Sequence, residues 1–306
     1  MDDKTLNKGI DKVSDIIVKS KRIVVFTGAG VSTESGIPDF RSPGGLWDKY
    51  NPDDFLYQRF LSSEVSREKY WKMNSELYYI LVDARINKAH YAIVELERMG
   101  KLDCVITQNI DNLHQKAGLS DDKVIELHGT NMWVNCLNCK KRYSREDIQF
   151  RLEKGIKVPY CDDCGGILKP ATISFGQPMP FEETKEAERR SRLADLFIVI
   201  GSSLVVQPAA MMPLYAREGG AKLVIINMEN TPYDRNADVV LYGKAGEIME
   251  ELVECPFNTF TINIPSPLMG EGQGRGEESL CCPLPFIPSH QGRGDIFGKV
   301  IYESKH

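Results

Sequence analysis

The segment RIVVFTGAGVSTESG, residues 22–36, joins a run of apolar, largely β-branched residues to a glycine-rich loop. An apolar run of this length that stops at glycine predicts a buried strand. If the strand belongs to a parallel sheet, the following loop lies where such sheets bind ligands, at the carboxyl ends of the strands. The loop from Gly28 to Gly36 is therefore the first candidate for a binding site.

Short apolar strands and helices alternate along most of the chain. Further runs of buried-strand character lie at residues 103–107, 123–127, 195–200, 222–227 and 238–241. Helical patterns lie near residues 4–20, 87–100, 180–192, 207–219 and 245–254. This alternation predicts an α/β fold, a Rossmann-like, doubly wound parallel sheet.

Two segments interrupt the alternation. Residues 41–86 hold many aromatic residues without a strand pattern and predict a helical, loop-rich insert, whereas residues 131–170 carry paired cysteines and short strand-like pieces. We expect the two inserts to form a smaller domain. The larger, ligand-binding domain then comprises residues 1–40, 87–130 and 171–255.

The last fifty or so residues differ in composition. Proline and glycine make up 11 of the 30 residues in 265–294, a level at which ordered packing is not expected. We therefore predict that residues 256–306 form a disordered tail.

The composition of the 306-residue chain excludes several classes of protein. Apolar residues make up 42%, enough for a core, but no apolar run approaches the roughly 20 residues of a membrane span. The net charge of −5 argues against a nucleic-acid binder, which needs positive charge for phosphates. The first residues lack the apolar core of a signal peptide, so we expect a cytoplasmic protein.

Four of the eight cysteines have the spacing of a metal site. Cys136 and Cys139 form one C-x2-C pair, and Cys161 and Cys164 form a second, with 21 residues between the pairs. Because the cytosol disfavours disulfides, two such pairs predict one tetrahedral zinc ion. Four thiolates leave no position for water, so its role is structural. A redox dithiol and a zinc ribbon that binds nucleic acid are the alternatives.

The glycine loop departs from the dehydrogenase pattern. Gly28 and Gly30 suit close approach of the backbone to a pyrophosphate, but Thr33 stands where a third glycine is required for that pattern. This favours dinucleotide binding without hydride transfer. Two later strand ends offer further polar groups, at residues 201–203 and 227–229.

Polar segments also follow two strands in the middle of the chain, at residues 107–114 and 126–130. His128 is the best candidate for a general base, because imidazole titrates near physiological pH. His114 is expected on a short helix, and His90 is interpreted as a residue on a helix surface.

Taken together, these segments resemble the sirtuin family of NAD-dependent protein lysine deacylases, over roughly residues 10–254. Besides the two cysteine pairs, the matching motifs are GAGVSTESGIPDFRS (28–42), TQNIDNLHQKAG (107–118), ELHGT (126–130), GSSLVVQPAA (201–210) and IINMEN (225–230).

The resemblance implies a role for each matching position. His128 is implied as the base, and Asn109 and Asp111 as catalytic residues that hold the ribose and the carboxamide. The residues implied to bind NAD are Gly28, Ala29, Gly30, Ser32, Asp39, Phe40, Arg41, Gln108, Asn109, Asp111, Gly201, Ser202, Ser203, Asn227, Glu229, Lys244 and Ala245. Those implied to flank an extended acyl-peptide are Ile173, Phe175, Gly176 and Val205.

The implied activity is NAD-dependent protein-lysine deacetylation, with transfer of the acyl group to ADP-ribose and release of nicotinamide. The partners would be acylated proteins or peptides, with no membrane and no nucleic acid. The family often has Glu at the position of Gln177, and members that prefer acidic acyl groups carry a Tyr-x-x-Arg motif that is absent from residues 41–90. We therefore expect uncharged acyl groups. Mono-ADP-ribosyl transfer, hydride transfer and a non-enzymatic zinc-ribbon module remain alternatives.

Overall fold

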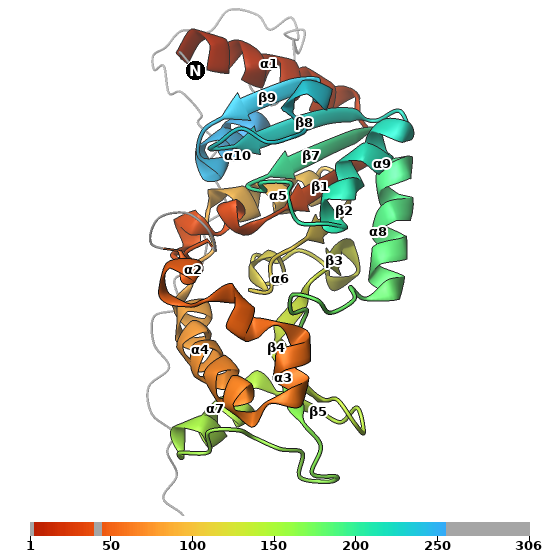
Figure 1. Cartoon of the computed structure of the whole chain (residues 1–306). Coiled ribbons are helices and arrows are strands. Elements are labelled where there is room, and N and C mark those ends of the chain that lie inside the picture. The colour runs from red at the N-terminus through yellow and green to blue at the C-terminus, as the bar shows by residue number, and fades with distance from the viewer. Residues whose placement is uncertain (1–2, 40–44, 255–306) are drawn as a thin grey trace, which may run out of the picture. The chain divides into compact units, whose positions relative to one another are not determined.

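A six-stranded parallel sheet forms the larger part of the computed structural model, which describes residues 3–39 and 45–254 (Figure 1). The strand order is β3-β2-β1-β7-β8-β9. The strands are β1 (Ile23–Thr27), β2 (Leu102–Thr107), β3 (Val124–Glu126), β7 (Leu196–Ile200), β8 (Lys222–Asn227) and β9 (Val239–Tyr242). All neighbouring pairs are parallel, which confirms the predicted fold class.

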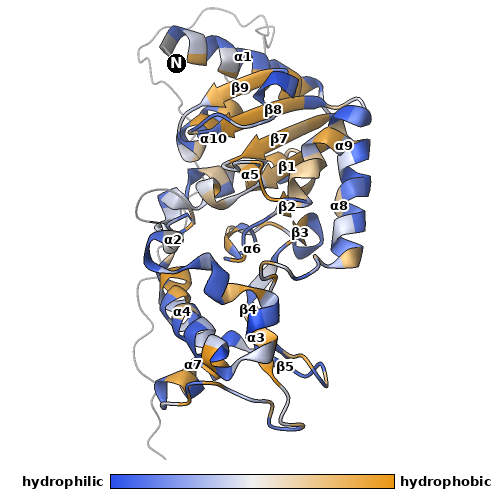
Figure 2. Ribbon diagram, viewed as in Figure 1, coloured by the Kyte–Doolittle hydropathy of each residue, from blue (hydrophilic) through white to orange (hydrophobic). Residues whose placement is uncertain are grey.

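Both faces of this sheet are covered by helices, because alternate residues of a strand point to opposite faces. Ile23 and Val25 pack with one set of helices, and Val24 and Phe26 with the other. The first set is α1 (Asp3–Lys19), α5 (Lys88–Arg98) and α10 (Ala245–Glu254), and the second is α8 (Phe181–Leu193) and α9 (Met212–Glu218). Figure 2 shows strands β7, β8 and β9 largely in the orange of hydrophobic residues.

The smaller part contains an antiparallel sheet in the order β5-β4-β6. Its strands are β4 (Gly129–Cys136), β5 (Arg142–Ser144) and β6 (Leu168–Thr172). They pack with α7 (Arg145–Glu153) and with Trp71 of α4 (Glu64–Asp83), and the short helices α2 (Leu46–Lys49), α3 (Tyr57–Ser62) and η3 (Pro52–Phe55) precede α4. Residues 41–86 are therefore helical where described, as predicted.

Helix α7 is absent from the sequence-based prediction. It buries Arg145, Ile148 and Gln149, so its inward face is mostly polar and gives no apolar repeat. The predicted division into a larger and a smaller domain stays a prediction, and residues 256–306 lie outside the described residues. Among the described helices, none has the length and apolar character of a membrane span.

Candidate functional site

The loop after β1 packs directly on the loop after β7. The backbone N–H of Gly30 donates to the carbonyl oxygen of Gly201 at 2.8 Å. A Cβ atom added at Gly30 would lie 2.7 Å from the Gly201 Cα, and one added at Gly28 would lie 2.7 Å from the Gly201 oxygen. Contact between the two loops therefore requires glycine at positions 28 and 30, whether or not a ligand also approaches the backbone there.

The same loop is fastened to two helices. It forms the short turns η1 (Ala29–Val31) and η2 (Thr33–Ser35) rather than leading directly into an α-helix. The Asn87 side chain, which caps α5, donates to the Val31 oxygen at 2.7 Å and to Ser35 Oγ at 2.9 Å. A Glu34 carboxylate oxygen accepts the Gly246 N–H at 2.8 Å, at the start of α10. The loop is therefore held by two helices that cover the same face of the sheet.

Polar side chains from the loops after β1, β2 and β7 meet at the carboxyl edge of the sheet. Ser32 Oγ donates to Asp111 Oδ2 at 2.8 Å, and the Asn109 amide lies 3.1 Å from both Ser32 Oγ and the Gly28 oxygen. The Gln108 amide donates to Ser202 Oγ at 2.8 Å. Asp111 is buried and also accepts the Leu113 N–H at 2.9 Å. The structure thus joins residues far apart in the sequence into one hydrogen-bonded network.

His128 follows β3 at the same edge. Its Nδ1 lies 3.0 Å from the backbone oxygen of Gln108. Because a carbonyl oxygen only accepts, Nδ1 carries the proton and Nε2 keeps the lone pair. Burial lowers the pKa of His128, and the Gln108 carbonyl opposes this in part. The imidazole is therefore neutral at neutral pH, with Nε2 as its basic atom.

His90 and His114 form a buried pair beneath this network. Their ring centroids lie 5.0 Å apart, and each side chain is at most 2% exposed. His114 Nε2 lies 3.0 Å from the Thr27 hydroxyl, and His114 lies on the short helix α6 (Leu113–Lys116), as expected. The interpretation of His90 as a surface residue was wrong, because its face of α5 packs inward.

The residues predicted to flank a peptide lie in two segments, one after β6 and one after β7. The Ile173 N–H donates to the His128 oxygen at 2.8 Å, which ties this segment to the candidate base. The Tyr57 N–H donates to the Phe175 oxygen at 2.9 Å. The side chains of Phe175 and Val205 are exposed, and Gly176 has a φ of 78°, in the left-handed region.

Several of the remaining predicted cofactor residues lie around the ends of β7, β8 and β9. Ser203 is exposed after Ser202, and the Asn227 amide donates to the Glu229 oxygen at 2.9 Å. Lys244 pairs with Glu247 at 2.9 Å, and Ala245 begins α10. Ala29 and Asp39 are half-buried in the described part of the loop after β1. Phe40 and Arg41 lie outside the described residues.

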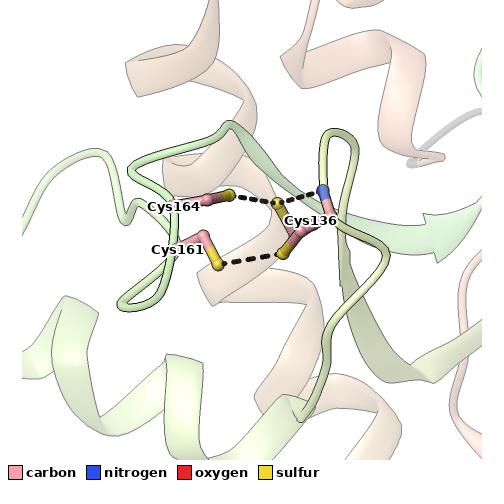
Figure 3. Close-up of side chains that lie close together, drawn as sticks. Cys136, Cys161 and Cys164 are labelled. Atoms are coloured by element: carbon pink, nitrogen blue, oxygen red, sulfur yellow. Dashed lines mark hydrogen bonds between the residues drawn. The ribbon is translucent and has the colours of Figure 1, made fainter.

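The four paired cysteines converge on one point (Figure 3). Their Sγ atoms all lie within 4.8 Å of one another, with Cys136 to Cys164 and Cys139 to Cys161 each at 3.6 Å. A tetrahedral zinc ion with Zn–S bonds of about 2.3 Å needs sulfurs about 3.8 Å apart, so the geometry fits zinc. The glycines after the second pair serve this close approach: a Cβ at Gly166 would lie 2.9 Å from the Cys136 sulfur. No disulfide joins the described cysteines.

Comparison with known proteins agrees with this geometry. Residues 28–208 match the model of the Sir2 family. The NAD-dependent protein deacetylase of Thermodesulfovibrio yellowstonii is 43% identical over 82% of this chain and 97% of its own length. The NAD-dependent protein deacylase 2 of Archaeoglobus fulgidus is 44% identical over 80% of this chain and 95% of its own length.

Solved structures give the same result. A Sir2 structure with a p53 peptide and NAD+ superposes with a TM-score of 0.75 at 39% identity, covering 82% of this chain and 99% of that one. A Sir2Tm structure bound to a propionylated peptide gives a TM-score of 0.74 at 38% identity, covering 81% and 98%.

Proposed function

The chain belongs to the Sir2 family, and from this premise we propose that the polar network at the carboxyl edge of its six-stranded sheet performs NAD-dependent protein-lysine deacetylation. The relatives named above are NAD-dependent protein deacetylases and deacylases, and solved Sir2 structures hold NAD+ and peptides. The NAD-dependent deacetylase or deacylase activity is therefore assigned to this chain, and its cofactors are NAD and one zinc ion at the four cysteines.

The orientation of the His128 ring is the main support for assigning this residue as the general base. Its Nδ1–H is engaged by the Gln108 carbonyl, so the lone pair of Nε2 is available to take a proton from a ribose hydroxyl. NAD supplies the ADP-ribose that accepts the acyl group as nicotinamide leaves. We assign to Asn109 and Asp111, which share the Ser32 hydroxyl, the task of fixing the ribose and carboxamide.

The rest of the binding surface follows from the loop positions. The turns from Gly28 to Ser35 pack beside Gly201 and Ser202, and we assign the phosphates of NAD to these two loops. Asn227, Glu229 and the start of α10 at Ala245 would receive the adenosine end. Zinc takes no part in a reaction step: the four thiolates hold together the small sheet, whose strand β6 leads into the peptide-binding segment at Ile173.

The acyl-peptide would bind as an extended strand beside Ile173, Phe175, Gly176 and Val205. The acyl group is expected to be uncharged, because residues 41–90 lack a Tyr-x-x-Arg motif. We further propose a cytoplasmic location, because reduced thiolates at the zinc site require a reducing compartment.

The test is release of nicotinamide from NAD in the presence of acetyl-, propionyl- and succinyl-lysine peptides, with mass analysis of the peptide product. We expect a deacylated peptide with the acetyl and propionyl substrates, and loss of product with His128→Ala. Transfer of ADP-ribose to the peptide, or unchanged turnover of the variant, would contradict the assignment.

A further inference from the structure

Lys169 is a buried lysine beside the proposed peptide-binding segment. Its side chain is 1% exposed, on β6, opposite Asn135 of β4. Its ammonium donates to the backbone oxygen of Thr172 and lies 3.5 Å from that of Pro170. Among the described residues, no carboxylate forms an ion pair with Lys169. A buried charge without a counter-ion is costly, so these carbonyl contacts indicate a specific role.

Tyr70 of α4 completes the surroundings of this ammonium. The Lys169 Nζ lies 5.7 Å from the centre of the Tyr70 ring and 6.0 Å from that of Tyr57. The Tyr70 hydroxyl lies 3.4 Å from the hydroxyls of Thr172 and Ser174. Burial raises the pKa of Tyr70, but the charge of Lys169 and the hydroxyls of Ser174 and Thr172 more than offset this, so its pKa lies below the ordinary value.

These contacts all converge on the chain from Thr172 to Phe175. Lys169 contacts Thr172, and Tyr70 contacts both Thr172 and Ser174. Ile173 and Phe175 are held through hydrogen bonds of their backbone groups. The Ile173 N–H donates to the His128 oxygen, and the Phe175 oxygen accepts from the Tyr57 N–H. Successive residues of the segment are thus fixed from three different elements.

We propose that Lys169 and Tyr70 are positioning residues for the acyl-peptide, which act by fixing the backbone of residues 172–175. An extended peptide can pair with this segment only if the N–H and C=O groups of the segment lie at fixed positions. The hydrogen bond between Ile173 and His128 also links the position of the segment to that of the base. This role rests on the proposed function. Neither side chain touches the reacting atoms.

The experiment compares Lys169→Met and Tyr70→Phe with matched controls on the same part of the chain. Met keeps the length of the side chain without the charge, and Phe keeps the ring among Phe55 and Phe60 without the hydroxyl. The controls are Lys157→Met, whose side chain is 73% exposed, and Tyr79→Phe, which is exposed on the same helix α4.

Loss of a charge-assisted hydrogen bond predicts that Lys169→Met raises the KM for the acyl-peptide by about tenfold. Tyr70→Phe raises it less, because its contacts are neutral and longer. The KM for NAD stays unchanged in both variants, and the controls behave as the wild type. Equal changes in the two KM values, or changes of the same size in the controls, would overturn the proposal.

A second measurement does not depend on activity. Hydrogen exchange of the free protein should show faster exchange of the Ile173 amide in Lys169→Met and Tyr70→Phe, with β1 and β2 unchanged. Unchanged exchange at Ile173 would overturn the positioning role even if activity fell. If exchange increases but the wild type releases no nicotinamide with any acyl-peptide, the proposed function fails and the role in peptide binding fails with it.

Discussion

At His128, burial and hydrogen bonding act on the pKa in opposite directions, and burial has the larger effect. The base is active when neutral, so kcat/KM should be constant at neutral pH and fall only as the pH drops through the pKa. Because that pKa is lowered, the midpoint of the fall should lie below the ordinary histidine value of 6.5. The pH profile of kcat/KM with an acetyl-peptide measures it, and a midpoint above 6.5 would contradict the arrangement.

The buried pair of His90 and His114 predicts a loss of stability in acid. Burial lowers the pKa of His114 to about 4, and burial together with the charge of His114 lowers that of His90. The unfolded chain takes up these protons below pH 6.5, whereas the folded chain does not until lower pH. The free energy of unfolding should therefore decrease as the pH is lowered below 6.5, by up to about 1.4 kcal/mol per pH unit for each histidine.

Urea unfolding at several pH values tests this, with His90→Leu as the informative variant. Leu removes one titrating group and keeps an apolar side chain of similar size in the buried position. The slope of stability against pH should become smaller than in the wild type. Equal slopes would mean that His90 is accessible to protons in the folded state.

His90 shows that the burial of a residue cannot be predicted from its type alone. The sequence interpretation places His90 on a helix surface, yet Ile93 and Val94, three and four positions on, are buried. Residues at this spacing share one helix face, so the apolar neighbours are a signal that places His90 inside. By contrast, His128 could be singled out because it follows an apolar strand, whereas the roles of Asn109 and Asp111 were implied by the family resemblance. Their hydrogen bonds, such as Ser32 to Asp111, depend on contacts between separate loops and could not be predicted.

At the scale of single elements, the apolar strands were the most predictable part of the chain. β1, β7 and β8 are buried along nearly their whole length, so composition alone marks them. Helix α7 was not predicted, because Arg145 and Gln149 face inward and the helix has no apolar repeat. Arg145 packs 4.9 Å from the centre of the Tyr78 ring. The glycine loop was placed correctly, but its packing on Gly201 depends on β7, a strand far away in sequence.

The two cysteine pairs join separate turns of the small sheet. The small sheet should depend on zinc, because the end of β4, the turn between β4 and β5, and the turn before β6 carry the four sulfurs. We expect one zinc ion per chain in the wild type and none in Cys161→Ala, with loss of deacetylation because the segment after β6 is no longer held.

Metal analysis and the activity assay measure both effects. Cys104→Ala is the matched control: Cys104 is also buried, but it lies on β2 and outside the cluster. It should keep its zinc and its activity. Zinc retained by Cys161→Ala, or lost from Cys104→Ala, would contradict the assignment of the four ligands.

At the scale of the molecule, the site is built from separate parts of one sheet edge. The loops after β1, β2, β3 and β7 contribute Ser32, Asn109, His128 and Ser202, and hydrogen bonds join each loop to the next. The small sheet contributes through the chain that leaves β6 and reaches the His128 backbone at Ile173. It also contributes through β4, whose Asn131 N–H donates to the Ile110 oxygen at 3.0 Å. NAD contacts are therefore assigned to the loops of the six-stranded sheet, and peptide contacts to the boundary between that sheet and the small sheet. A change in the small sheet should consequently affect peptide binding before cofactor binding.

Residues 246–306 carry none of the side chains assigned to the site. Every residue assigned here to NAD, peptide or zinc lies at or before Ala245, and about 252 residues already match nearly the whole length of the Thermodesulfovibrio relative. A chain shortened to residues 1–261 keeps α10, whose Ile248, Met249 and Leu252 pack on the large sheet. We expect it to retain one zinc ion and the kcat and KM values of the full chain. Steady-state kinetics with both substrates, beside thermal unfolding, measure this. A raised peptide KM at unchanged unfolding temperature would show that residues 262–306 take part in substrate binding, whereas a lowered unfolding temperature alone would assign them to stability.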